Sequence, residues 1–407
     1  MKILFITSRL PWPLDKGDRV RAYHQMRMLN KDHEVFLFTL TEEHPSKEAQ
    51  LALSQVTTGL KWYKVNRWKR WVRLAFAALS SRPFQIHWFY QRKADHELHQ
   101  WMGQLGPDVI HCQLVRMAEY VRNDHQIPKV LDYMDALSAG MNRNAALRPM
   151  GSRWIFQLEA HRLARYESIV FDYFDGQTII SQADRKLIAH PGRNAIDVIP
   201  NGVDSEYFNN GNATEKKPNA KSVILFTGNM SYPPNVDAAK LLVNDILPKI
   251  QTPDVQVVIA GTKPTIEVQK LASDQVIITG WIDDLRTAYA SADAFVAPLR
   301  IGTGQQNKIL EAMAMELPCI TTPHVLSGFP EHDTAAPPLV LAESPTATAH
   351  AIDELLTNKS KCAEIGKKSR IWIEKNSSWE AQARLLEESF VNSTLYKPEE
   401  ATWKIKR

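Results

Sequence analysis

Two cations, two glycines and a carboxylate lie close together between residues 300 and 311. The sequence there is RIGTGQQNKILE, with Arg300 and Lys308 around a glycine-containing loop and Glu311 three residues after Lys308. Gly302 and Gly304 would let the backbone approach a ligand closely. The two cations would neutralise a diphosphate, and Glu311, on the same helical face as Lys308, could accept hydrogen bonds from ribose hydroxyls. A loop with solvated charges is the alternative, but the clustering favours a binding site.

Short apolar runs that alternate with helical segments must position these residues. The first series of runs comprises 2–7, 34–40, 108–114, 129–133 and 176–181, and the second comprises 222–228, 255–261, 276–280, 293–299, 318–322 and 339–342. Such runs predict parallel strands covered on both faces, so two series predict two doubly wound α/β domains. Ligands of such sheets bind beyond the carboxyl ends of the strands, where helix N-termini suit phosphate.

The polar stretch 198–222 is typical of a linker between two domains. It predicts an N-terminal domain of residues 1–205 and a C-terminal domain of residues 206–377. The helical segment 378–395 follows the second series of strands, and we expect it to pack back onto the first domain. Helices are expected from about Asp18 to Leu29 and from about Asn235.

Composition excludes several classes of protein. The chain has 407 residues, 44% of them hydrophobic and 23% charged, and its net charge of +4 is too small by itself to indicate nucleic-acid binding. Its three cysteines are far apart, which fits a reducing compartment and offers no zinc-ligand spacing. The opening MKILFITSRL reads as a buried strand and not as a signal peptide, and no run is long enough to span a membrane. We therefore expect a cytoplasmic protein.

Several motifs resemble those of a known family. They are VIPNGVDSEYF (198–208), ILFTGNMSYPPNVDAAKLL (224–242), VVIAG (257–261), the stretch 278–322 and SSWEAQARLLEE (377–388). In this order they resemble family 4 glycosyltransferases of the GT-B fold, in particular the sugar transferases associated with bacterial exopolysaccharide and exosortase gene clusters. The N-terminal half matches more loosely, through residues 3–29, 107–114 and 129–138.

The resemblance implies two Rossmann-like domains facing a central cleft, with a nucleotide-diphosphate-sugar held by the C-terminal domain and a saccharide acceptor by the N-terminal one. It also implies a hexosyl transfer that retains the anomeric configuration and needs neither a metal nor another cofactor. Glu311 matches the second glutamate of the family's Glu-x7-Glu motif, whereas Thr303 stands in the place of the first. The stretch GNMSYPPN (228–235) lacks the family's usual Arg and Lys, and we expect Arg300 and Lys308 to replace them. The expected donor-binding residues are Gly228, Arg300, Gly302, Thr303, Gly304, Lys308 and Glu311.

The N-terminal half offers fewer candidates. Where family members commonly carry a histidine, LDYMDALS carries Asp135, which could orient the sugar or assist the acceptor, or else serve as a helix cap or turn residue. In the first loop, Gly17 could allow a close approach to the donor phosphate. Arg19 and Arg21 would face either the cleft or solvent, and we expect the cleft.

The stretch 61–93 contains nine Lys or Arg residues, four Trp, two Tyr and no acidic residue. Basic residues beside aromatic ones fit a surface that lies on an anionic membrane. The alternatives are aromatic residues packed into the domain and, last, single-stranded nucleic acid. With the family motifs, this acid-free stretch indicates a lipid-linked acceptor at the inner face of the cell membrane.

Other functions remain possible. A nucleotide-sugar 2-epimerase would use a similar fold but no acceptor, and a degenerate GT-B protein would only bind. A nicotinamide-dependent oxidoreductase is disfavoured, because neither FITSRLPWPLDKG nor FTGNMSYPPN has the G-x-G-x-x-G spacing. The base, the sugar, the acceptor, the linkage and the oligomeric state do not follow from the sequence.

Overall fold

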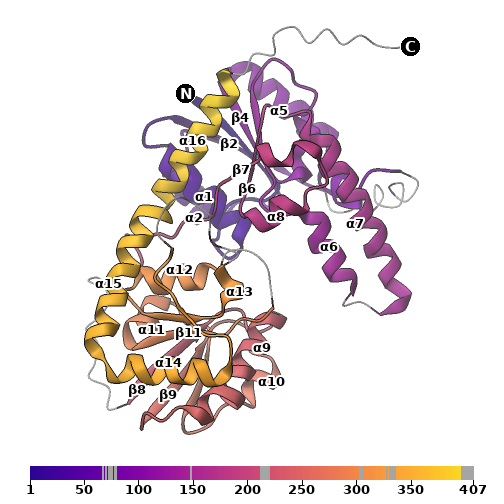
Figure 1. Cartoon of the computed structure of the whole chain (residues 1–407). Coiled ribbons are helices and arrows are strands. Elements are labelled where there is room, and N and C mark those ends of the chain that lie inside the picture. Colours follow the sequence, from indigo (N-terminus) through magenta and orange to yellow (C-terminus); the bar gives the residue numbers. More distant parts are fainter. Residues whose placement is uncertain are drawn as a thin grey trace. The chain divides into compact units, whose positions relative to one another are not determined.

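The computed structural model describes residues 1–66, 68, 71, 77, 80–146, 149–210, 221–301, 306–326, 329 and 336–395. The contacts divide the chain into two compact units, which are described separately (Figure 1). Unit 1 contains Met1–Ile199 and the chain from Ala383 onward, and unit 2 contains Pro200–Gln382.

Unit 1 is built on a seven-stranded sheet in which every pair of neighbouring strands is parallel. The order is β3-β2-β1-β4-β5-β6-β7. The strands are β1 (Lys2–Thr7), β2 (Glu34–Thr41), β3 (Gly59–Lys64), β4 (Val109–Gln113), β5 (Lys129–Asp132), β6 (Gly176–Ile179) and β7 (Asp197–Val198). Sequence reasoning missed β3 and β7, which are the two edge strands and carry little buried apolar side-chain surface.

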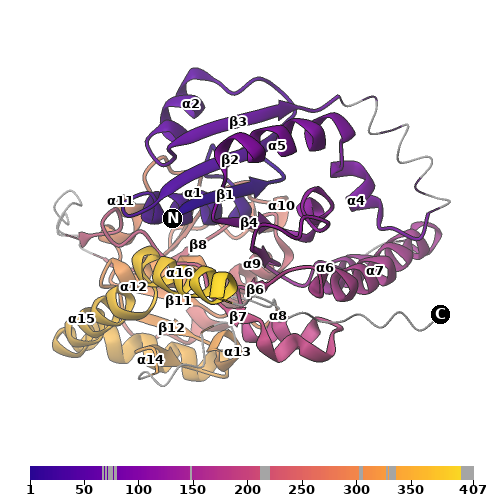
Figure 2. The same ribbon diagram turned by 90° about the horizontal axis from the view of Figure 1, so that it is seen from above.

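The helices of unit 1 connect and cover these strands. They are α1 (Gly17–Leu29), α2 (Lys47–Ser54), α4 (Phe84–Phe89), α5 (Arg92–Leu105), α6 (Leu137–Ala146), α7 (Met150–Phe171) and α8 (Gln182–Leu187), with 3-10 turns η1 (Val115–Tyr120) and η2 (Pro191–Ala195). Helices α6 and α7 lie side by side, as Figures 1 and 2 both show. The last helix, α16 (Trp379–Leu395), begins in unit 2 and belongs to unit 1 from Ala383 onward, where Phe390 packs on His111.

A buried ion pair joins α1 to the end of β5. Arg21 and Asp132 are both fully buried, and Arg21 Nε donates to Asp132 Oδ2 at 2.6 Å. Asp132 Oδ1 also accepts from the Thr178 hydroxyl and the Met134 backbone N–H, each at 3.1 Å. Burial alone raises the pKa of Asp132, but the charge and hydrogen bond of Arg21, nearby His111 and the hydrogen bond from the Met134 backbone outweigh it and lower the pKa. Arg21 is therefore part of the core, and the prediction that it faces a cleft is wrong.

Unit 2 repeats the architecture with six parallel strands in the order β10-β9-β8-β11-β12-β13. They are β8 (Ser222–Thr227), β9 (Val255–Ala260), β10 (Val276–Gly280), β11 (Ala294–Ala297), β12 (Cys319–Thr321) and β13 (Val340–Leu341). The helices are α9 (Pro233–Leu241), α10 (Ile266–Gln269), α11 (Leu285–Ser291), α12 (Asn307–Ala314), α13 (Pro323–Leu326), α14 (Pro345–Thr357) and α15 (Lys359–Asn376), with short turns η4 (Leu242–Ile246) and η5 (Leu247–Lys249).

Each sheet reverses its strand order beside its first strand. β1 lies between β2 and β4, and β8 lies between β9 and β11. At such a switch point the connecting segments leave in opposite directions, so the carboxyl ends of the two central strands are open to a ligand. The prediction of two doubly wound parallel domains is confirmed.

Replacing Arg21 by Met should destabilise unit 1 strongly. The substitution leaves the Asp132 carboxylate buried without its cation, which costs about 3–5 kcal/mol in comparable pairs. The control is Arg19→Met on the same helix, where an exposed pair with Asp15 is worth at most about 1 kcal/mol. Urea unfolding checks both variants, and equal losses of unfolding free energy would contradict a structural role specific to Arg21.

Candidate functional site

A hydrogen-bonded chain of side chains lies at the switch point of unit 2. The Tyr289 hydroxyl on α11 donates to Glu311 Oε2 on α12 at 2.8 Å and lies 3.0 Å from the Thr227 hydroxyl at the end of β8. Tyr289 is fully buried, whereas Glu311 remains partly accessible. Burial raises the pKa of Glu311, and Tyr289 and nearby Lys308 oppose that rise. Glu311 is thus held in one orientation with part of its surface available to a ligand.

Lys308 is held by neutral groups beside the hydrogen-bonded side chains of Thr227, Tyr289 and Glu311. Its ammonium donates to Asn235 Oδ1 on α9 at 2.5 Å and lies 5.1 Å from the centre of the Phe226 ring. Burial lowers the pKa of Lys308 to about 8, although Glu311 opposes the shift. A cation with an amide and an aromatic ring as its close partners retains much of its attraction for an anion.

Two glycines make room for this arrangement after β8 and β9. A Cβ on Gly228 would lie 2.7 Å from Asn235 Nδ2, and one on Gly261 would lie 1.8 Å from the Gly228 carbonyl oxygen. Asn235 is itself fixed, because its Nδ2 donates to the Asn229 carbonyl at 2.9 Å. A side chain at Gly228 would therefore displace the amide that holds Lys308, which explains why glycine is suited to this predicted site position.

Arg300 follows β11 but is already paired. Its guanidinium donates to both carboxylate oxygens of Asp237 on α9, at 2.7 and 3.2 Å, and 56% of its side chain is exposed. Arg300 and Lys308 thus both reach α9, through Asp237 and Asn235 respectively. The predicted positions Gly302, Thr303 and Gly304 lie outside the described residues.

Sequence reasoning missed three residues that organise this site: Asn235, Asp237 and Tyr289. The motif 224–242 contains the first two, and its Asn-x-Asp spacing at the start of a helix was a signal that could have been used. Tyr289 carried no such signal, because it lies 22 residues from its partner Glu311.

In unit 1, Asp135 lies just beyond the carboxyl end of β5. The residue is exposed, yet the protein around its carboxyl reduces hydration and, with Asp184, raises the pKa of Asp135 to about 6. The preceding Met134 has a φ of 62°, and Leu114 at the end of neighbouring β4 has a φ of 68°. Such left-handed backbone at non-glycine residues costs free energy and is concentrated at functional sites.

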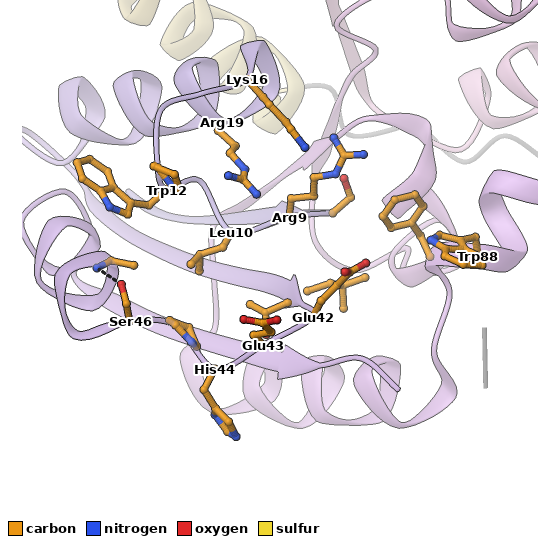
Figure 3. Close-up of a pocket in the computed structure, with 17 residues that line it drawn as sticks. Arg9, Leu10, Trp12, Lys16, Arg19, Glu42, Glu43, His44, Ser46 and Trp88 are labelled. Atoms are coloured by element: carbon orange, nitrogen blue, oxygen red, sulfur yellow. Dashed lines mark hydrogen bonds between the residues drawn. The ribbon is translucent and has the colours of Figure 1, made fainter. Parts of the chain in front are cut away.

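A pocket of about 530 Å³ lies at the ends of β1 and β2 in unit 1 (Figure 3). The predicted residue Arg19 lines it and pairs with Asp15 at 2.8 Å. Gly17 starts α1 near this loop, and a Cβ there would meet nothing within 4 Å, so the space over it is open. The structure brings Arg19 to a pocket and places Arg21 in the core.

The described residues of the acid-free stretch 61–93 are partly packed and partly exposed. Lys61 to Lys64 form most of β3, and Val65, Ile86 and Phe89 are buried. Trp68 and Trp71 are 82% and 59% exposed, and the Trp71 ring meets Trp88 edge to face at 5.2 Å. Four of its nine basic residues, Arg67, Lys69, Arg70 and Arg73, lie outside the described residues.

The described residues contain neither a metal-binding group of side chains nor a membrane-spanning helix. In this part of the chain no group of three or more His, Cys, Asp or Glu side chains is arranged to hold a metal ion. None of the helices found there combines the length and the apolar character needed to cross a bilayer.

Comparison with known proteins connects the unit 2 site to a family. Residues 221–358 match the family described as "Glycosyl transferases group 1". This segment runs from β8 to α14 and contains Asn235, Tyr289, Lys308 and Glu311. The match supports glycosyl transfer as the chemistry of this domain. No curated protein matches the sequence significantly.

Solved structures resemble both units. A glycosyltransferase from Rickettsia africae ESF-5 is 14% identical with a TM-score of 0.67, over 97% of this chain and 99% of that one. Sucrose-phosphate synthase from Thermosynechococcus elongatus is 15% identical with a TM-score of 0.65, over 98% and 100%. Anabaena HepE in complex with UDP is 13% identical with a TM-score of 0.65, over 96% and 100%. These likenesses, with the two parallel sheets, show a two-domain Rossmann-like GT-B fold.

Replacing Lys308 by Met should change how stability depends on pH. The unfolded chain keeps an ordinary lysine pKa near 10.4, whereas folding lowers the pKa of Lys308 to about 8. The wild type therefore pays for a buried charge below that pH and gains stability as the pH rises, and the variant does not. The unfolding free energy of the wild type, relative to that of Lys308→Met, should rise by about 1–2 kcal/mol between about pH 7.5 and 9.5.

Urea titrations at several pH values provide the measurement. Lys240→Met is the control, since Lys240 is a surface lysine paired with Glu267. Parallel pH curves for the wild type and Lys308→Met would show that Lys308 carries no buried charge.

Proposed function

We propose that the chain is a family 4-like, retaining hexosyltransferase. In this proposal unit 2 binds a nucleotide-diphosphate-sugar and unit 1 binds a saccharide acceptor. This acceptor belongs to the lipid-linked saccharides of bacterial polysaccharide synthesis at the inner face of the cell membrane. The observation that carries it is the network of Asn235, Lys308, Tyr289 and Glu311 at a switch point inside the matched segment.

The donor half of the proposal rests on charge and geometry. Glu311 is oriented by Tyr289 and remains accessible, as a carboxylate that accepts ribose hydroxyls must be. Lys308 offers a partly desolvated cation for the diphosphate. Solved structures of HepE hold UDP and UDP-glucose, which makes UDP the first nucleotide to test.

The proposed chemistry needs negative charge to be stabilised as the nucleotide leaves. Lys308 interacts directly with charge that develops on the diphosphate, and preorganised groups of this kind contribute most to the rate in such reactions. Arg300 can serve the same charge only by sharing or leaving Asp237. We therefore assign the larger effect on turnover to Lys308. No metal or other cofactor enters the proposal.

A binding-only GT-B protein is the second candidate. The observations in its favour are Thr303 in place of a glutamate and the absence of Arg and Lys from 228–235. Incubation with a nucleotide-sugar and membrane-derived lipid distinguishes the two, because only the enzyme releases nucleoside diphosphate.

Glu311→Ala should weaken nucleoside diphosphate binding while unit 2 stays folded. Loss of a charged hydrogen bond costs about 1.5–3 kcal/mol, which is roughly a tenfold to hundredfold rise in Kd. Calorimetry should start with UDP and continue with the other nucleoside diphosphates, using Glu364→Ala as a surface control on α15. If Glu311→Ala binds as tightly as the wild type, Glu311 does not contact the nucleotide.

The acid-free stretch should bind anionic vesicles. Each basic residue near such a surface contributes about 1 kcal/mol, and salt screens the attraction over about 10 Å at 0.1 M. Reversing Lys69, Arg70 and Arg73 to Glu should abolish most co-sedimentation with anionic vesicles, whereas reversing Lys359, Lys361 and Lys368 on α15 changes net charge equally and should not. Equal losses in both triple variants would mean that net charge alone governs binding.

A further inference from the structure

The pocket at the ends of β1 and β2 is lined by unit 1 residues, and its two walls carry opposite charges. Its volume of about 530 Å³ lies in the range of small-molecule sites. One wall comes from the loop between β1 and α1 together with the first turn of α1, and the other from the loop between β2 and α2 (Figure 3). The question is which single molecule would satisfy both walls.

The first wall carries three cations: Arg9, Lys16 and Arg19. Two carboxylates partly balance them, since Arg9 pairs with Asp18 at 3.2 Å and Arg19 with Asp15 at 2.8 Å. Among the described residues Lys16 makes no ion pair, and the buried Nε of Arg19 has no hydrogen-bond acceptor.

The directions of these side chains indicate an anion. Figure 3 shows the ammonium group of Lys16 and the guanidinium group of Arg9 directed toward one another. Like charges that converge repel, and an anion between them would reverse the sign of that interaction. A phosphate group offers acceptor oxygens to several such donors at once.

The second wall requires a different chemical group. Glu42 and Glu43 follow β2, are exposed, and lie on the opposite side of the pocket from Lys16 and Arg19 (Figure 3). Ionised carboxylates only accept hydrogen bonds, so they repel phosphate and suit hydroxyl groups. A ligand that satisfies both walls carries a phosphate next to several hydroxyls, as a phosphorylated sugar does.

Two tryptophans stand at opposite ends of the pocket. Figure 3 shows Trp12 at one end and Trp88 at the other. The Trp88 ring also contacts Trp71, which is 59% exposed and belongs to the acid-free stretch. The Trp88 end therefore leads from the charged walls to an exposed aromatic surface, where an apolar chain attached to the phosphate can lie.

We propose that this pocket is the acceptor site and that the acceptor is a phosphate-linked saccharide. Its phosphate binds Arg9, Lys16 and Arg19, its sugar hydroxyls bind Glu42 and Glu43, and a lipid chain leaves past Trp88. The assignment of the ligand as an acceptor rests on the proposed function, whereas the binding of a phosphate-linked sugar does not.

Calorimetry with glucose 1-phosphate and methyl glucoside tests the ligand class on the full chain. The wild type should bind glucose 1-phosphate at least about tenfold more tightly than methyl glucoside, and Lys16→Ala and Arg19→Ala should each remove about tenfold of that affinity. The matched control is Lys186→Ala on α8, at the other end of the sheet, which should bind as the wild type does. Equal binding of the two sugars, or wild-type binding by both pocket variants, overturns the proposal.

Vesicles distinguish the two sources of such a ligand. Neutral phosphatidylcholine vesicles are compared with the same vesicles containing polyprenyl phosphate. The protein should bind the vesicles with polyprenyl phosphate more tightly than the neutral ones. If Lys16→Ala and Trp88→Ala both reduce this difference, and Trp88→Ala still binds glucose 1-phosphate, the acceptor is lipid-borne. Binding of glucose 1-phosphate without any effect of polyprenyl phosphate supports the same ligand class from a soluble source and removes the lipid chain from the proposal.

Failure of this inference is separable from failure of the proposed function. UDP binding depends on unit 2 and should be unchanged in Lys16→Ala. If nucleotides bind but glucose 1-phosphate does not, the acceptor pocket is wrong and the donor site stands. If glucose 1-phosphate binds through Lys16 but no nucleoside diphosphate binds, the pocket stands as a sugar-phosphate site and the transferase assignment falls.

Discussion

The strands that lie next to the first strand of each sheet are the constraint on which the two sites depend. Because β8 lies between β9 and β11, the helices that follow β8 and β11 start beside each other, and Asn235 on α9 can hold Lys308 on α12. Because β1 pairs directly with β2, the loop after β1 lies beside the loop after β2, and a pocket with two differently charged walls forms between them. A sheet that added strands in one direction only would separate β8 from β11, and Asn235 and Lys308 would not meet.

Each unit contains a buried cation, but the two cations have different kinds of partner. This difference distinguishes a structural role from a binding role. In unit 1 the buried Arg21 is matched by an equally buried carboxylate, Asp132, whose pKa is lowered. In unit 2 the ammonium of Lys308 is held by an amide and an aromatic ring, and its pKa is lowered to about 8. A buried cation with a complete partner is already compensated within the fold, whereas a cation held by neutral groups is stabilised further when an anion arrives.

Much of the fold could be predicted from the sequence, because buried parallel strands are continuous apolar runs and helices follow them. Lys308 and Glu311 were also recognisable, since their spacing on one helix is a local property. Arg19 and Arg21 could not both face the same way, because residues two apart on a helix lie on different faces, but the sequence did not show which of them is buried. Asp132, the partner that buries Arg21, lies 111 residues away. Separation in sequence also made the pairing of Arg300 with Asp237 and the pocket built from two separate loops impossible to predict.

Hydrogen–deuterium exchange in the presence of UDP tests the central claim most directly, because it reports where on the chain a nucleotide binds. A nucleotide at the switch point of unit 2 should protect two segments, residues 226–236 at the end of β8 and residues 306–313 at the start of α12, and should leave unit 1 unchanged. Glu311→Ala should remove this protection at the same UDP concentration. Protection confined to unit 1, or protection that Glu311→Ala leaves intact, would contradict a nucleotide site at the switch point of unit 2.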